Sequence, residues 1–233
     1  MHLKLLEIKN LNKSFDKKAI LEDVNMEISS GKIIGLLGKN GAGKTTLIKI
    51  INDLLTSDSG EVYVQGKPIG VETKKIISYL PERTYLNKNM KVSEVIQYFK
   101  DFYEDFDAEK AEKLLKDLGL DINAHLSKMS KGMQEKVQLV LVMSRKAELY
   151  ILDEPLGGVD PATRDYILDT ILSNFNENAS VIISTHLISD IERILDEVIF
   201  IDKGEIVLQS DADKLRKKEK SSIDEIFRRM FKC

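Results

Sequence analysis

The amino-acid sequence predicts an α/β fold with a mostly parallel central sheet. Short β-rich runs recur along the chain, and two of them, "LYILD" at 149–153 and "SVIIST" at 180–185, are apolar without alternation. Such runs are typical of strands that are covered on both faces. Between them, apolar residues follow the spacing of one helix face: Ile167, Leu168, Ile171, Leu172 and Phe175. The alternation of strand and helix favours the α/β class.

Further strands are expected where β-branched and apolar residues cluster between turn signals. These runs are "KIIGLLG" at 32–38, "EVYVQGKPI" at 61–69, "IISYL" at 76–80, "DEVIFI" at 196–201 and "EIVLQS" at 205–210. A segment without proline, from Glu82 to Glu154, separates the earlier strands from the later ones. The chain is therefore interpreted as a single domain, 1–233, interrupted by an insertion.

The insertion, at about 81–136, is predicted to be helical because two sets of apolar residues repeat at i, i+3, i+4 and i+7. The sets are Val92, Val95, Ile96 and Phe99, and Ala111, Leu114, Leu115 and Leu118. A third helix is expected after Gly132. The insertion joins the core through a connector that carries Tyr85, Leu86 and Met90, which either contact a partner or close the small helical core.

The C-terminal tail, 211–233, is predicted to be short and helical. Its run "KLRKKEK" at 214–220 reads as a solvated charge run or as a contact with anionic lipid headgroups. The following "SSIDEIFRRMF" starts with a capping box and places apolar residues on one face. This helix docks either on the chain's own core or on a partner.

Composition limits the possible functions. Charged residues make up 31% of the chain and the net charge is −3, which argues against nucleic acid as a partner bound through bulk electrostatics. The single cysteine, Cys233, excludes a disulfide within the chain and fits a reducing cytoplasm. No apolar run approaches the roughly 20 residues that span a bilayer, and the first residues lack a signal peptide. A soluble intracellular protein is expected.

The most informative motif is "GKNGAGKT", Gly38 to Thr45, which follows the strand "IIGLL" and opens the apolar helix "TLIKII". Glycines allow backbone N–H groups to point inward at phosphate oxygens, and the helix N-terminus adds its positive dipole end. Lys44 can reach the β- and γ-phosphates and Thr45 can ligate Mg²⁺. The alternative is a glycine-rich turn without a ligand. The predicted nucleotide contacts are Gly38, Lys39, Asn40, Gly41, Ala42, Gly43, Lys44, Thr45 and Thr46.

Two adjacent acids end the run "LYILDEP". Unpaired charge at the end of a buried strand is costly unless it meets a cation or takes part in chemistry. Asp153 suits Mg²⁺ beside the phosphate loop, and Glu154 suits the orientation or deprotonation of an attacking water. The alternative is a strand end with two solvated acids.

With "GKNGAGKTT", "MSKGMQ", "LYILDEP", "GVDP" and "STH" in that order, the sequence resembles the ATP-binding subunit of an ABC transporter over roughly residues 3–210. The resemblance implies a P-loop NTPase (RecA-like) core, an N-terminal antiparallel β subdomain and an inserted helical signature subdomain. It also implies a head-to-tail dimer, of identical or paralogous chains, with two ATPs at the interface.

The resemblance gives the segment "MSKGMQ" a role as the family signature, usually written LSGGQ. Ser130, Gly132 and Gln134 match its serine, second glycine and glutamine, whereas Met129, Lys131 and Met133 depart from it. The family presents this helix N-terminus to the γ-phosphate of the partner's ATP. The alternative is a plain helix capped by Ser130.

The resemblance assigns four further residues. Phe15 stands where an aromatic stacks on adenine, although alone it would read as a core phenylalanine. Glu82 replaces the usual Q-loop glutamine and remains a candidate Mg²⁺ ligand. Asp160 caps a helix or faces the partner's active site. His186 is expected to contact the γ-phosphate.

The resemblance therefore implies an ATPase with in-line attack of water on the γ-phosphate. Lys44, Glu154 and His186 are its predicted catalytic residues, and Thr45, Asp153 and Glu82 are its predicted Mg²⁺ ligands. The implied partners are a second ATP-binding subunit and a separately encoded transmembrane subunit at the cytoplasmic face of the cell membrane. Departures such as "SKGM" favour an exporter of drugs, peptides or lipids. The alternative is an ABC-type ATPase of translation or DNA repair.

Overall fold

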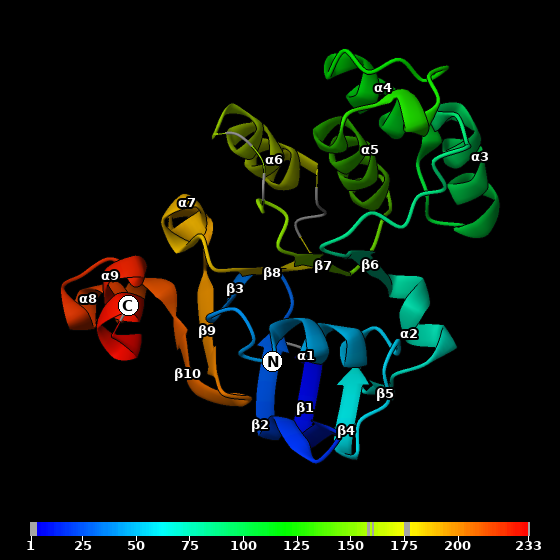
Figure 1. Ribbon diagram of the computed structural model, residues 1–233. Coiled ribbons are helices and arrows are strands. Elements are labelled where there is room, and N and C mark those ends of the chain that lie inside the picture. Colours follow the sequence, from blue (N-terminus) through cyan, green and yellow to red (C-terminus); the bar gives the residue numbers. More distant parts are fainter. Residues whose placement is uncertain (1–3, 158, 160, 175–177, 233) are drawn as a thin grey trace.

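Two β-sheets form the body of the protein (Figure 1). The computed structural model describes residues 4–157, 159, 161–174 and 178–232. The larger sheet has six strands in the order β10-β9-β3-β8-β7-β6, and the smaller has four in the order β2-β1-β4-β5. The strands are β1 Lys4–Phe15, β2 Lys18–Ser29, β3 Ile33–Leu37, β4 Ser59–Val64, β5 Lys67–Pro68, β6 Ile77–Leu80, β7 Leu149–Asp153, β8 Ser180–Thr185, β9 Glu197–Asp202 and β10 Glu205–Asp211.

The six-stranded sheet is parallel from β9 to β6, and only the edge strand β10 runs antiparallel to its neighbour. The central strands β3, β7 and β8 are buried at every position, as their continuous apolar runs predict. This arrangement confirms the predicted fold class. It also gathers the C-terminal ends of β3, β7 and β8 at one edge of the sheet, where parallel α/β folds bind their ligands.

The four-stranded sheet is the antiparallel N-terminal subdomain. Its first hairpin turns at Asp16 and Lys17, and its last at Gln65 and Gly66, and all four residues have positive φ. Two successive residues with positive φ form the turn that matches the twist of a tight hairpin. The first turn pairs β1 with β2 along their whole length, and Ile20 and Leu21 of β2 lie beside Gly43, the residue before α1.

The helices of the protein cover both sheets and build the insertion. They are α1 Lys44–Ile51, α2 Val71–Ile76, α3 Val92–Phe102, α4 Ala108–Asp117, α5 Lys131–Met143, α6 Pro161–Asn174, α7 Ile188–Ile191, α8 Ala212–Glu219 and α9 Ile223–Phe231, with short 3-10 turns at Leu126–Lys128 and Glu192–Ile194. One apolar cluster lies between the two sheets and includes α1, and a second packs α6 to α9 on the other side of the larger sheet.

The insertion has its own apolar cluster, formed by α3, α4 and one face of α5. The first predicted periodic set lies in α3, and the second lies in α4 with its last member, Leu118, at the C-cap. Helix α5 belongs to two clusters, because Val137 packs in the insertion whereas Leu139 and Met143 pack against the larger sheet. The predicted boundary at residue 136 therefore falls within α5, which joins the insertion to the core.

One prediction on the second half of the chain needs correction. Leu172 is 40% exposed rather than part of the buried face of α6, and Phe175 lies outside the described residues. The charge run at 214–220 lies in helix α8 and its C-cap, and most of its charged side chains are exposed, as expected of a solvated charge run. The prediction for α9 is confirmed: Ser222 and Glu225 form its capping box, and Phe227 packs into the chain's own core.

Candidate nucleotide-binding site

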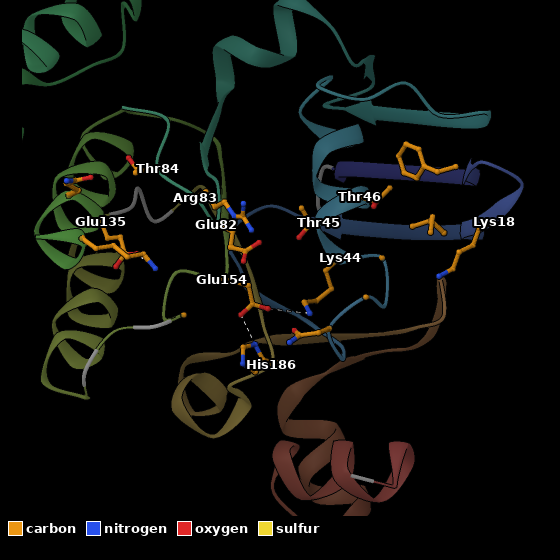
Figure 2. Close-up of a pocket in the computed structure, with 18 of the residues that line it drawn as sticks. Lys18, Lys44, Thr45, Thr46, Glu82, Arg83, Thr84, Glu135, Glu154 and His186 are labelled. Carbon is orange, nitrogen blue, oxygen red and sulfur yellow. Dashed lines mark hydrogen bonds and ion pairs between the residues drawn. The ribbon is translucent and has the colours of Figure 1, made fainter. Parts of the chain in front are cut away.

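A cavity of 1170 Å³ lies where the two sheets and the insertion meet (Figure 2). Its walls come from the β1–β2 hairpin, the loop before α1, the connector after β6, the start of α5 and the ends of β7 and β8. Among the predicted site residues, it brings together Phe15, Asn40, Gly41, Gly43, Lys44, Thr45, Thr46, Glu82, Gln134, Glu154 and His186.

The loop before α1 needs its glycines for two different reasons. A Cβ on Gly38 would lie 2.5 Å from the Ile201 carbonyl oxygen, so the loop passes β9 too closely for any side chain. Gly41 and Gly43 have φ of +81° and +110°, which L-residues adopt only with strain. The loop therefore packs against β9 and turns directly into the first residue of α1.

Lys44, the first residue of α1, is buried and held by the loop that precedes it. Its ammonium donates to the carbonyls of Gly38, at 2.7 Å, and Lys39, at 3.3 Å. It also lies 3.4 Å from Glu154 Oε1. A phosphate bound at Lys44 would compete with this carboxylate for the same cation.

Asp153, the last residue of β7, lies at the centre of a buried polar group. Its Oδ1 accepts hydrogen bonds from Ser184 Oγ, at 2.5 Å, and from Thr45 Oγ1, at 3.4 Å. Its Oδ2 is buried and has no hydrogen-bond partner among the described residues. Burial, with a smaller effect of the nearby Glu154 and Glu82 charges, raises the pKa of Asp153.

Glu154 follows in a strained backbone conformation, with φ of +51°. Its N–H donates to Ser184 O at 3.0 Å and lies 3.2 Å from Ser184 Oγ. Its Oε2 lies 3.0 Å from His186 Nδ1 (dashed in Figure 2). The sequence reasoning missed Ser184, whose position two residues before His186 was the available signal.

The start of α5 presents the predicted signature. Ser130 is exposed and caps the helix, since its Oγ accepts from the Met133 N–H at 3.3 Å. Apart from its chain neighbours and the backbone of its own helix, no heavy atom of the described residues lies within 4 Å of the place that a Cβ on Gly132 would take. The protein's own packing therefore gives no reason for a glycine at this position.

Gln134 is turned differently from the rest of the signature. Its side chain is buried, and Nε2 donates to the carbonyls of Leu126, at 2.9 Å, and Met129, at 3.0 Å. It thus fastens the turn before α5 to the helix. Met133, which precedes it, is 36% exposed.

Three of the four residues assigned by resemblance, Phe15, Glu82 and His186, line the cavity. Phe15 is 46% exposed, so the reading of it as a core phenylalanine is wrong. Glu82 lies on the connector, next to Arg83 (Figure 2). Asp160 lies outside the described residues. Three cations on the cavity wall were missed by the sequence reasoning, namely Lys18, Arg83 and Lys88.

The parallel α/β core, the glycine loop on α1 and the acids beyond β7 together define a P-loop ATPase. The family described as "ABC transporter" matches residues 21–157, more than half of the chain, and the protein belongs to this family. An ABC transporter ATP-binding protein of Methanocaldococcus jannaschii is 33% identical over 87% of this chain and 76% of its own.

A second relative, the lantibiotic transport ATP-binding protein SrtF of Streptococcus pyogenes, is 31% identical over 90% of this chain and 92% of its own. A solved ATP-binding subunit of an ABC transporter superposes with a TM-score of 0.86, at 29% identity, over 96% of this chain and 98% of that one. The protein is thus an ATPase subunit that serves transport, and a role in translation or DNA repair is not favoured. No helix in the described part of the chain has the length and apolar character to cross a membrane.

Proposed function

We propose that this chain hydrolyses ATP in a site completed by a second ATP-binding subunit. Together they drive a separately encoded membrane subunit, from the cytoplasmic face of the cell membrane. The observation that carries the proposal is the contrast between the two ends of the site. The loop, the acids and His186 hold one another within the chain, whereas Ser130 and Gly132 face outward.

ATP is expected to bind with its phosphates along the loop from Gly38 to Thr46. Lys44 stabilises the negative charge of the phosphates, and Phe15 offers an exposed ring for stacking on the adenine. Glu154 accepts the proton of the attacking water, and His186 holds the Glu154 carboxylate by the contact at 3.0 Å. This geometry favours attack by water at the γ-phosphate end of the loop.

The acids also fit Mg²⁺. The buried Asp153 Oδ2 has no partner among the described residues, and an unpaired buried carboxylate oxygen is a costly group that a cation satisfies. Thr45 adds a hydroxyl beside Asp153, and Glu82 supplies a further carboxylate from the connector. Hard oxygen ligands of this kind are those that Mg²⁺ prefers. When bound, Mg²⁺ would neutralise charge on the phosphates.

The start of α5 is proposed to serve the partner's ATP. Ser130 supplies a hydroxyl, Gly132 allows close approach of the backbone, and the helix N-terminus favours an anion. Gln134 contributes indirectly, since its buried amide fixes the turn that carries Met129. Asp160 is proposed to lie across from the partner's site.

The connector and α3 are proposed to contact the membrane subunit. Tyr85, Tyr98 and Phe102 are 54%, 56% and 66% exposed, and the rings of Tyr98 and Phe102 stack at 6.0 Å. Leu86, by contrast, is buried in the insertion. The exposed aromatic side chains suit a partner surface. The similarity to a lantibiotic transport protein supports export of peptides, drugs or lipids.

Mixed dimers test the shared site. Lys44→Ala removes the cation of the loop, and Ser130→Arg blocks the start of α5. Each variant alone is expected to be nearly inactive, because every site in either dimer lacks one half. When the two variants are mixed, half of the sites in each mixed dimer are intact, so ATPase activity should return.

Crosslinking between distinctly tagged chains supplies the control, because it shows that mixed dimers have formed. Activity that returns in proportion to mixed dimers supports a shared site. Full activity of Ser130→Arg alone would contradict it. So would mixed dimers that stay inactive while dimers of one variant chain and one unaltered chain hydrolyse ATP.

A further inference from the structure

We propose that Ser184 is a positioning residue that holds both acids of the site, Asp153 and Glu154, in place. It orients the Asp153 carboxylate for Mg²⁺ and fixes the backbone on which Glu154 stands. The inference rests on the proposed function and adds a residue to it. Ser184 is fully buried in β8, the strand between β3 and β7. In the sheet register it lies opposite Asp153, so its side chain meets that carboxylate from the neighbouring strand.

The first step concerns Asp153. A carboxylate turns about a broad, roughly two-fold torsion, so packing alone does not decide which oxygen points where. Ser184 Oγ donates to Oδ1 at 2.5 Å, and Thr45 Oγ1 donates to the same oxygen at 3.4 Å. Both donors therefore engage Oδ1 and leave Oδ2 without a partner among the described residues. The carboxylate is held with one oxygen reserved for a cation.

The second step concerns Glu154. Its φ of +51° is a strained conformation for a residue with a side chain, so the surrounding structure must hold it. Ser184 does this twice: its carbonyl accepts from the Glu154 N–H at 3.0 Å, and its hydroxyl oxygen lies 3.2 Å from the same nitrogen. The hydroxyl of Ser184 thus donates its proton to Asp153, the proposed Mg²⁺ ligand. Its hydroxyl and carbonyl oxygens both lie at the backbone N–H of Glu154, the proposed base.

The third step concerns His186, two residues further along the chain. Its Nδ1 lies 3.0 Å from Glu154 Oε2, so the backbone and the carboxylate of Glu154 are held by neighbouring residues of the same strand end. A change at Ser184 is therefore expected to move both acids together.

A buried serine can also have a purely structural role, and two serines of the chain show what that would look like. Ser78, in β6, is buried and donates to the Val142 carbonyl at 2.9 Å. Ser144 is buried and its Oγ has no hydrogen-bond partner among the described residues. Neither touches the acids, so both provide matched controls for the loss of a buried hydroxyl.

The experiment measures equilibrium binding of a non-hydrolysable ATP analogue to the full chain, once with Mg²⁺ and once with EDTA. The ratio of the two affinities reports how well the acids hold Mg²⁺, independently of turnover. In Ser184→Ala this ratio should fall about tenfold or more, as is usual when a group that orients a metal ligand is lost. Binding in EDTA, which depends on the loop and Lys44, should change little.

Ser184→Cys separates hydrogen bonding from packing, because it keeps the approximate volume and replaces the hydroxyl by a weak donor. It should lose the Mg²⁺ effect as Ser184→Ala does. Ser78→Ala should lower the melting temperature and leave the ratio unchanged, and Ser144→Ala should change neither. The inference is overturned if Ser184→Ala or Ser184→Cys keeps the ratio of the unaltered chain, or if Ser78→Ala lowers it equally. An unaltered chain whose affinity ignores Mg²⁺ would overturn the proposed magnesium site itself.

Discussion

The nucleotide loop leads into the N-terminus of α1, and Ser130 precedes the N-terminus of α5, but the contacts around these two helix starts differ. Around the loop, the functional groups have partners within the chain: Lys44 contacts Glu154, and Thr45 contacts Asp153. At the start of α5, Ser130 caps its own helix, and Gly132 stands in open space. This difference supports the proposal that each chain contributes two separate halves to sites that it shares with a second chain.

The glycines of the two regions make the same contrast. Gly38 cannot carry a side chain, because a Cβ would lie 2.5 Å from a backbone oxygen of β9. Gly132 can carry one without any contact, and as a helix residue it costs about 0.5–1 kcal/mol relative to alanine. The space around each glycine thus distinguishes Gly38, which the fold requires, from Gly132, for which we propose a role in binding a ligand.

The largest expected effect comes from removing the proposed catalytic base, Glu154, beside the nucleotide loop. Glu154→Gln should lower the ATPase rate about 10³-fold, because an amide cannot accept the proton from water. ATP binding should remain, since Lys44 and Asp153 are unchanged, and the trapped nucleotide should stabilise the dimer in gel filtration. A variant that hydrolyses ATP at the unaltered rate would remove Glu154 from the proposed mechanism.

The next effect tests the surface proposed for the membrane subunit. Tyr85→Asp should reduce ATP-driven transport about tenfold or more, because it places a charge where an apolar contact is expected. The isolated subunit should keep its nucleotide affinity and its melting temperature, since Tyr85 is 54% exposed.

Two controls belong with this variant. Val71→Asp changes a residue of α2 that is 73% exposed and should leave transport intact. Leu86→Asp should instead destabilise the chain, because Leu86 is buried in the insertion. Loss of folded protein in Tyr85→Asp would assign that residue to the fold rather than to a partner.

A smaller effect is expected where the Phe15 ring is proposed to stack on the adenine. Phe15→Ala should weaken ATP binding about tenfold, since stacking of a base on an aromatic ring contributes about 1–3 kcal/mol. The melting temperature should stay the same, because the ring is 46% exposed. Phe15→Tyr keeps the ring and should bind ATP normally, whereas equal binding by Phe15→Ala and the unaltered chain would exclude the stacking role.

The smallest effect separates stability from function at α5. Gly132→Ala should stabilise the protein by about 0.5–1 kcal/mol, because alanine is the better helix former and meets no neighbour. The same variant should lower ATPase activity several-fold, because a Cβ would stand between the backbone and the partner's phosphate. Denaturant unfolding and steady-state ATPase assays measure the two changes. An increase in stability without a loss of activity would make Gly132 an ordinary helix residue.

The sequence was most informative where local chemistry and fold agree. Sequence patterns correctly predicted the loop before α1, the buried strands β7 and β8, and the helices α3 and α4. The hairpin of β1 and β2 was only implied by resemblance. Its alternation breaks at bulges near Asn10 and Asp23, both with positive φ, and its turn lacks the usual glycine.

Within the site, the sequence reasoning failed where a role depends on the direction of a side chain. Ser184 and Gln134 are polar residues whose partners come from distant parts of the chain or from a preceding turn, and no spacing rule reveals those contacts. The prediction for Leu172 was wrong although a spacing rule existed. Leu172 fits the apolar period of α6 but lies at the solvent side of that helix.

Helix α5 reaches from the surface of the insertion to the larger sheet. One face of its last turns, with Leu139 and Met143, packs against the larger sheet, and its first residue follows Ser130 at the surface of the insertion. Thirteen residues span about 20 Å, so a tilt of about 10° at the packed end displaces Ser130 by about 3 Å. A hydrogen bond is lost over such a distance. A rotation of α5 by this amount would therefore be enough to break a contact between Ser130 and the ATP that we propose it serves.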